Sequence, residues 1–199
     1  MLADPSLSTN FDVVALAASA GGLNALTHVL ATLPGDFPAA LVVVQHLDPR
    51  HRSLMADILS RRTAIPVKEA SEGDVLQPGR AFIAPPNRHL LVNPDGRVSL
   101  TQTQLVHFVR PSADLLFEST AASFKERAIA VVLSGSGSDG AMGVRAIKKM
   151  GGTVIVQDAK QAEFAGMPEA AQATGVVDFV LALDEIAPAL EKLCARSDD

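Results

Sequence analysis

The chain has 199 residues, of which 48% are hydrophobic and 20% are charged, a length and balance typical of one globular domain and not of a disordered chain. Its net charge of −5 and its lack of Trp and Tyr argue against nucleic-acid binding and against aromatic platforms for bases or sugars. The single cysteine, Cys194, excludes an intrachain disulfide and favours the reducing cytoplasm.

Residues 1–10 are polar and rich in Pro and Ser, so we expect a flexible tail ahead of a single domain over residues 11–195. The tail has neither the basic start nor the apolar core of a signal peptide. The apolar runs 13–18 and 41–44 fall far short of the ~20 residues that a membrane span needs. We therefore expect no insertion into a membrane.

The first and last parts of the chain alternate between short apolar runs and helical patterns. Apolar runs rich in Val are typical of strands buried on both faces of a parallel sheet, and apolar residues at helical spacing predict the helices between them. The predicted strands are residues 11–18, 40–46, 128–134, 153–158 and 177–183. The predicted helices are residues 23–33, 54–61, 112–126, 141–150, 168–173 and 185–195. This alternation predicts an α/β fold, a doubly wound and mostly parallel sheet with helices on both faces.

The middle of the chain, residues 65–101, has a different pattern. Short strand-like pieces are separated by turn signals such as Pro85-Pro86 and Pro94-Asp95-Gly96. We expect a small antiparallel β insertion here.

Three polar residues follow three of the apolar runs. Ser19 follows the first and His46 follows the second, while Asp139 lies in the glycine-rich loop after the third. Ligands of a doubly wound sheet bind at the carboxyl ends of its strands. A serine, a histidine and an aspartate brought together there are the parts of a nucleophile, base and orienting carboxylate system. The small residues of Ser19-Ala20-Gly21-Gly22 would let the hydroxyl project from a tight turn, beside the free N–H groups of a helix start.

Each of these residues also has a structural interpretation. Ser19 suits the N-cap of the following helix, or a phosphate-binding turn that lacks the full dinucleotide spacing. His46 alone suits a structural histidine, and Asp139 alone suits the N-cap of the helix that begins near Ala141. Their joint placement favours the catalytic interpretation, because three independent caps need not be one Ser, one His and one Asp.

The remaining titratable groups give no metal or cofactor signature. Asp48, His51 and Asp57 form a loose group without ligand spacing, so we predict neither a metal nor a cofactor. Cys194 carries no sign of an activated thiolate. The other histidines are interpreted as surface or packing residues: His28, His51, His89 and His107.

Seven segments of the chain resemble a known family. They are ALAASAGGLNAL (15–26), LPGDFPAALVVVQHLDP (33–49), EASEGDVLQPGRAFIAPPNRHLLV (69–92), RPSADLLFEST (110–120), VVLSGSGSDGAMGVRAIKKMGG (131–152), QDAKQAEFAGMPEAA (157–171) and TGVVDFVLALDEIAPAL (174–190). In this order and spacing they resemble the catalytic domain of CheB-type chemotaxis protein-glutamate methylesterases.

The resemblance implies a function and a set of site residues. The family hydrolyses glutamate γ-methyl esters on the cytoplasmic helices of chemoreceptors, and many members also deamidate glutamine. By resemblance Ser19 is the nucleophile, His46 the base and Asp139 the orienting residue. The implied oxyanion and substrate contacts lie at Ala20, Gly21 and Ser136, and at Met167 in the loop Gly166-Met167-Pro168. This loop suits a turn that packs against the sheet equally well.

The chain departs from the family at several positions. Ala17 and Ala20 replace a Gly and a Thr around the nucleophile, and Ser136 replaces a Met, which changes the shape of the pocket but leaves backbone donors in place. About ten residues precede the first predicted strand, too few for the receiver domain of the usual family member. We therefore expect the receiver-less form, or the esterase module of a fused methylesterase–methyltransferase, in which phosphorylation does not act in cis. A regulatory partner could then act in trans.

Alternatives of other classes stay open at this stage. The scaffold could serve as a non-enzymatic signalling or binding module, since the expected receiver domain is missing. It could also be an esterase for another substrate, as Ala20 and Ser136 suggest. A nucleotide-binding protein that uses residues 19–22 is a further alternative, which the incomplete phosphate-loop signature disfavours.

Overall fold

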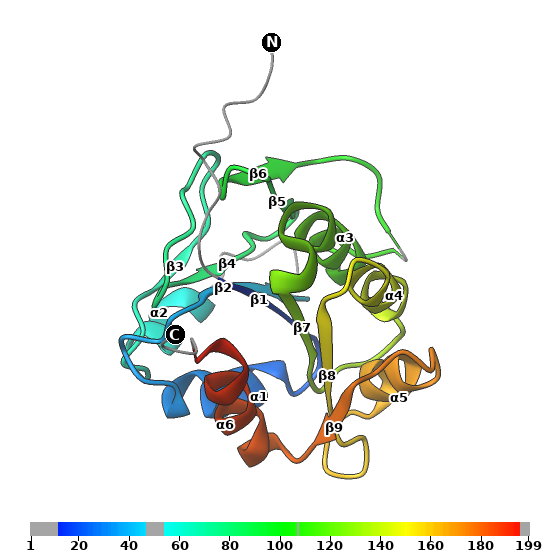
Figure 1. Ribbon diagram of the computed structural model, residues 1–199. Coiled ribbons are helices and arrows are strands. Elements are labelled where there is room, and N and C mark those ends of the chain that lie inside the picture. Colours follow the sequence, from blue (N-terminus) through cyan, green and yellow to red (C-terminus); the bar gives the residue numbers. More distant parts are fainter. Residues whose placement is uncertain (1–11, 47–53, 107, 196–199) are drawn as a thin grey trace.

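The computed structural model describes residues 12–46, 54–106 and 108–195. Within these residues, a sheet of 7 strands has the order β3-β4-β2-β1-β7-β8-β9, and a separate sheet pairs β5 with β6. All the pairings of the larger sheet are parallel, whereas β5 and β6 are antiparallel. The doubly wound, mostly parallel sheet that the sequence predicts is confirmed (Figure 1).

The elements follow the predicted alternation. The strands of the larger sheet are β1 (Val13–Ala18), β2 (Ala40–Gln45), β3 (Val67–Glu69), β4 (Ala81–Ile83), β7 (Ala128–Val132), β8 (Thr153–Gln157) and β9 (Phe179–Leu181). The smaller sheet consists of β5 (His89–Val92) and β6 (Val98–Thr101). The helices are α1 (Gly22–Thr32), α2 (Met55–Ser60), α3 (Ala113–Phe124), the 3₁₀ turn η2 (Lys125–Arg127), α4 (Ala141–Lys149), α5 (Gly166–Gln172) and α6 (Leu183–Cys194).

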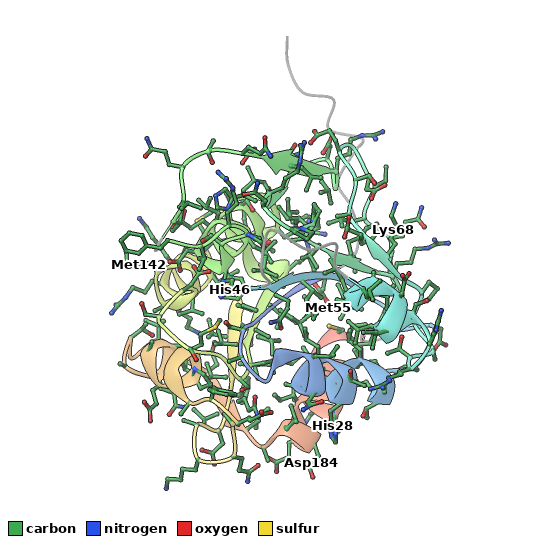
Figure 2. The ribbon with its side chains drawn as sticks, turned by 180° about the vertical axis from the view of Figure 1, so that it is seen from behind. His28, His46, Met55, Lys68, Met142 and Asp184 are labelled. Carbon is green, nitrogen blue, oxygen red and sulfur yellow. The ribbon has the colours of Figure 1, made fainter. Side chains whose placement is uncertain are left out.

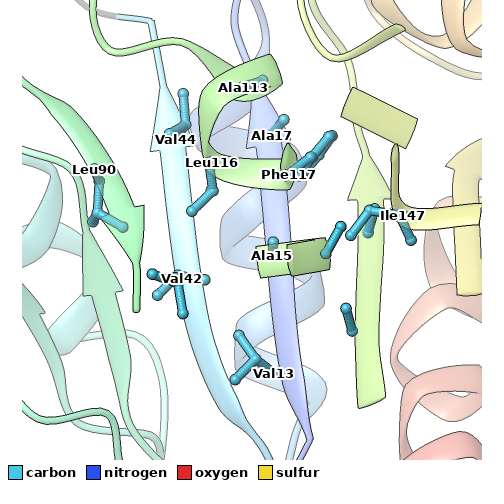
Figure 3. Close-up of a cluster of buried hydrophobic side chains, with 14 of the residues drawn as sticks. Val13, Ala15, Ala17, Val42, Val44, Leu90, Ala113, Leu116, Phe117 and Ile147 are labelled. Atoms are coloured by element: carbon cyan, nitrogen blue, oxygen red, sulfur yellow. The ribbon is translucent and has the colours of Figure 1, made fainter. Parts of the chain in front are cut away.

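Helices cover both faces of the sheet because its central strands are apolar at successive positions. Along β1, the side chains of Val13, Ala15 and Ala17 face α3 and α4 (Figure 3). The alternate residues Val14 and Leu16 belong to the opposite core, which α1 and α6 cover. Alternation along a strand thus gives β1 one core on each side, and all of its residues are buried.

The antiparallel part is smaller than predicted. The prediction assigned residues 65–101 to it, but β3 and β4 join the parallel sheet, with Ala81 in register with Leu41 of β2. The residues Ala81–Ile83 are apolar and buried at successive positions, which is the pattern of a parallel strand. The turn signals in this region therefore mark loops that return the chain to the parallel sheet, and only β5 and β6 form a hairpin.

The last predicted strand is also shorter than residues 177–183. The strand β9 ends at Leu181, and α6 begins at Leu183. Glu185 accepts a hydrogen bond from the backbone N–H of Ala182 at 2.9 Å, which satisfies a donor ahead of the helix.

The helices of the described residues were also compared with the length and apolar character that a membrane span requires, and none of them meets both requirements.

Candidate active site

Three neighbouring strand ends form the floor of the site. In the strand order, β1 lies between β2 and β7. Ala18 is in register with Gln45, and His46 donates its backbone N–H to the carbonyl of Ala18 at 3.1 Å. On the other side, the N–H of Ser19 donates to the carbonyl of Ser134 at 3.0 Å. The residues that follow β1 and β2, Ser19 and His46, are therefore adjacent at the carboxyl edge of the sheet.

The turn after β1 leaves the Ser19 hydroxyl uninvolved in helix capping. Gly21 is the N-cap of α1 with φ 72°, and within the part of the chain that the structure describes no side chain caps this helix end. The N-cap interpretation of Ser19 is therefore wrong. Gly22 has no room for a side chain, because a Cβ there would lie 1.9 Å from Oε1 of Gln45. Close packing at Gly22 and a left-handed backbone at Gly21 explain the two glycines.

Gln45 is a buried polar residue that sequence reasoning missed. Its Nε2 donates to the carbonyl oxygens of Ser19 at 2.7 Å and of His46 at 3.0 Å. The side chain is only 5% exposed. The amide therefore ties together the backbone of the two residues that follow β1 and β2. Its position at the end of a buried apolar run was a signal that could have identified it.

His46 and Asp139 are hydrogen-bonded. Nε2 of His46 lies 2.8 Å from Oδ2 of Asp139, and the carboxylate is 4% exposed. An ionised carboxylate only accepts hydrogen bonds, so Nε2 carries the proton of the neutral ring. The lone pair of His46 is then on Nδ1, which can act as a base.

The N-terminus of α3 surrounds Asp139 with donors. Its Oδ1 accepts from the Ser112 hydroxyl at 3.0 Å and from the Asp114 N–H at 3.0 Å, and its Oδ2 accepts from the Ala113 N–H at 2.6 Å. Burial acts to raise the pKa of Asp139, but the hydrogen bonds from His46 and from these backbone groups outweigh it and lower the pKa. Asp139 is therefore held ionised.

The predicted N-cap role of Asp139 in the helix near Ala141 is wrong. Gly140 is the N-cap of α4, with no side-chain cap. The donors of this helix end instead reach Asp114, whose Oδ1 accepts from the N–H groups of Gly140 at 3.0 Å and Gly143 at 2.7 Å. The two carboxylates thus make reciprocal contacts: Asp139, which precedes α4, accepts from the start of α3, and Asp114, on α3, accepts from the start of α4.

A pocket of about 310 Å³ opens beside His46, and its wall includes Phe108, Val109 and the loop 136–139. Phe108 is 95% exposed. It lies in a tight turn in which Val106 and Val109 exchange backbone hydrogen bonds of 3.2 and 2.9 Å. In Figure 2, His46 is seen between Met142 of α4 and Met55 of α2.

The predicted oxyanion and substrate residues lie around this floor. Among the described residues, the backbone N–H groups of Ala20 and Ser136 make no hydrogen bond, so both are free to donate to a ligand. Met167 is 1% exposed, and its N–H donates to the carbonyl of Gly135 at 2.8 Å. A Cβ at Gly135 would lie 2.3 Å from the Met167 sulfur and 2.9 Å from Cβ of Ser19. Met167 therefore packs close to Gly135 and Ser19 and does not line the pocket.

The other titratable residues have varied positions. His28 is exposed, and His89 is fully buried, whereas the predictions for Asp48, His51 and His107 lie outside the described residues. In the described part of the chain, no group of three or more His, Cys, Asp or Glu side chains could hold a metal ion. Burial raises the pKa of Cys194 to about 12, which keeps the thiol protonated.

Comparison with known proteins places this arrangement in a family. The family model described as CheB methylesterase matches residues 14–190. The chain belongs to the CheB methylesterase family. The catalytic domain of the Thermotoga maritima CheB methylesterase has a TM-score of 0.89 and 34% identity, over 93% of this chain and 100% of that one.

Relatives of different lengths share this domain. A protein of Leptospira interrogans is 40% identical over 178 residues, which are 89% of this chain and 92% of that protein. The protein-glutamate methylesterase/protein-glutamine glutaminase of Moorella thermoacetica is 41% identical over 193 residues, which are 95% of this chain but 46% of that protein. The chain thus matches nearly all of one relative and about half of the other, and it is related to enzymes that act on protein glutamate and glutamine side chains.

Proposed function

We propose that this CheB-family domain is a serine hydrolase that removes γ-methyl groups from glutamate residues of chemoreceptor-like signalling proteins in the cytoplasm. The observation that carries the proposal is the hydrogen bond of 2.8 Å from His46 to the buried, ionised Asp139, next to the strand end that carries Ser19. This arrangement leaves Nδ1 of His46 available as a base, and the hydroxyl of the neighbouring Ser19 does not cap α1. The family relationship supplies the substrate class.

The reaction proceeds through an acyl-enzyme. The Ser19 oxygen attacks the ester carbonyl while Nδ1 of His46 takes its proton, and Asp139 stabilises the imidazolium. Collapse of the tetrahedral intermediate expels methoxide, which leaves as methanol with the proton from His46. A water molecule, deprotonated by His46, then attacks the acyl carbon and releases the glutamate carboxylate and the Ser19 hydroxyl. Glutamine would react in the same way, with ammonia as the leaving group.

The backbone supplies the charge stabilisation that this reaction needs. The unpartnered N–H groups of Ala20 and Ser136 are suited to a developing oxyanion. Gly21, at the start of α1, adds the positive end of that helix. Because the donors are main-chain groups, the replacement of the family's Thr and Met by Ala20 and Ser136 leaves them in place.

The shape of the pocket favours a macromolecular substrate. The serine side chain is half-buried, and the wall beside His46 carries the exposed Phe108. A partly open site bordered by an exposed aromatic ring suits a side chain presented on a protein surface, such as a methylated glutamate on a receptor helix.

The deciding experiment measures methanol release from a methylated chemoreceptor fragment. Ser19→Ala is expected to lower kcat by at least 10³-fold, on the order of the loss seen when a triad member is removed, with an unchanged thermal unfolding midpoint. Ser60→Ala is the matched control, because Ser60 is exposed at the end of α2, and it is expected to retain full activity.

The alternatives predict different results. If the protein is a non-enzymatic module, the parent and both variants will release no methanol, and a serine-reactive phosphonate will not label the parent. An esterase for another substrate would hydrolyse simple methyl esters but not the methylated receptor. Equal rates for the parent protein and Ser19→Ala would contradict the mechanism.

A further inference from the structure

His89 is a buried histidine outside the pocket, and both of its ring nitrogens are hydrogen-bonded. It lies on β5, in the small antiparallel sheet, and is 0% exposed. Its Nδ1 accepts the backbone N–H of Ser112 at 3.1 Å, and its Nε2 lies 3.1 Å from the carbonyl oxygen of Gln104. A backbone N–H can only donate and a carbonyl can only accept. The ring is therefore neutral, with its proton on Nε2.

Ser112, which donates its N–H to His89, is also the first of the residues that donate hydrogen bonds to Asp139. Ser112 is the N-cap of α3, and its hydroxyl donates to Oδ1 of Asp139 at 3.0 Å. The next two residues donate their backbone N–H groups to the same carboxylate at 2.6 and 3.0 Å. Among the described residues, all the donors to Asp139 other than His46 thus come from a segment whose first backbone N–H donates to His89.

We propose that His89 is a positioning residue for the catalytic carboxylate, which acts by fixing the start of α3 and, through Ser112, the orientation of Asp139. The inference rests on the function proposed above. His89 does not reach the pocket, so it contacts neither the substrate nor the reacting atoms. The proposal also gives the β5–β6 hairpin a role, because His89 on β5 links Asp139, through Ser112, to an element outside the parallel sheet.

The charges around His89 support the neutral form. Burial acts first to lower its pKa, and the positive charge of Arg110 acts in the same direction, while the Gln104 carbonyl and the Asp139 carboxylate partly oppose them. On α3, the side chain of Asp114 accepts hydrogen bonds from the start of α4. The paired strand β6, Val98–Thr101, contributes no titratable side chain. The Nδ1 lone pair therefore remains available to Ser112.

Two substitutions separate positioning from packing. In His89→Asn, the amide oxygen can take the place of Nδ1 and accept from Ser112, while the contact to Gln104 is lost. In His89→Gln, the amide nitrogen can take the place of Nε2 and donate to Gln104, while the acceptor for Ser112 is lost. His28→Gln is the control, since His28 is an exposed histidine on α1.

The measurement is steady-state methanol release from a synthetic peptide that contains glutamate γ-methyl ester, at pH 7.5, with active sites counted by a serine-reactive phosphonate. For His89→Gln, we expect kcat to fall on the order of tenfold or more with KM changed by less than about twofold, as displacement of a supporting group produces. His89→Asn and His28→Gln are expected to keep kcat within about threefold of the parent, because in both the acceptor for Ser112 remains.

A second readout does not depend on activity. The Nε2 proton of His46, identified by its loss in His46→Ala, should give a downfield NMR resonance in the parent and in His89→Asn, and should shift in His89→Gln. The proposal is overturned if the two His89 variants lose kcat equally, if neither loses it, or if the resonance is the same in both. A parent protein that releases no methanol would instead reject the proposed function, and the resonance would still decide the role of His89.

Discussion

At the scale of single residues, Phe108 is an exposed aromatic side chain at the border of the pocket. An aromatic side chain that is 95% exposed leaves its apolar surface in contact with water. It borders the pocket beside His46 and is held in a turn with φ 65°. A substrate helix that covers this ring would bury apolar area, whereas a small ester would not reach it.

Phe108→Ala is therefore expected to raise KM for a methylated receptor fragment by roughly five- to thirtyfold, as for an aromatic contact at an interface. The value of kcat, and the hydrolysis of a small methyl ester, should stay unchanged. Phe179→Ala is the control, because Phe179 is an exposed phenylalanine on β9 and does not border the pocket. Equal KM values for the parent and Phe108→Ala would show that this ring does not contact the substrate.

At the scale of elements, the helices α3 and α4 are joined through exchanged carboxylates. Asp139, which precedes α4, accepts from the start of α3, and Asp114, within α3, accepts from the start of α4. At each helix start, two backbone N–H groups therefore donate to a carboxylate that belongs to, or directly precedes, the other helix. The carboxylate of Asp139 is in this way part of the packing of two helices.

Asp114→Ala should destabilise the domain by about 1–3 kcal/mol, because it leaves two buried backbone donors without an acceptor. Urea unfolding measures this change. Asp36→Ala, at an exposed loop position, should change the free energy of unfolding by less than about 0.5 kcal/mol. If both variants have the same unfolding midpoint, Asp114 does not hold α4 as described.

At the scale of the whole molecule, the stability of the fold depends on pH through groups that are buried in one charge state. The pKa values of His89 and Asp139 are both lowered in the folded protein. A lowered folded-state pKa means that the unfolded chain binds the proton more readily, so stability is present above the ordinary pKa and is lost on acidification. For His89 this loss begins below the ordinary value of 6.5, and for Asp139 only below 3.8.

Between pH 7.5 and 5.5 the thermal unfolding midpoint is therefore expected to fall, with His89 as a contributor and Asp139 unchanged in charge. His89→Asn removes the titrating group, so its midpoint should start lower but decline less over the same range. His28→Gln should follow the slope of the parent. A slope for His89→Asn as steep as that of the parent would mean that His89 is not protonated on unfolding in this range.

A comparison of the predicted and observed helices and strands shows which of them the sequence predicts and which it does not. Continuous apolar runs predicted the central strands well, because a strand buried on both faces must be apolar at each position. The same rule applied to Ala81–Ile83 would have placed it in the parallel sheet, but its length of 3 residues gave a weak signal beside stronger turn signals. Element ends such as Leu183 depended on capping contacts that a pattern does not carry.

The amino-acid pattern alone predicted the α/β class, the sheet edge at which chemistry could occur and the candidates Ser19, His46 and Asp139, because buried strands and the residues that follow them leave a local pattern. The surroundings of these residues became apparent only in the folded structure. The acceptor of the Ser112 N–H comes from 23 positions away in the chain, and Ser112 itself contacts Asp139 across 27 positions. Such contacts between buried polar groups follow no periodicity, since they depend on how separate elements pack, and they emerge only when the whole chain is folded.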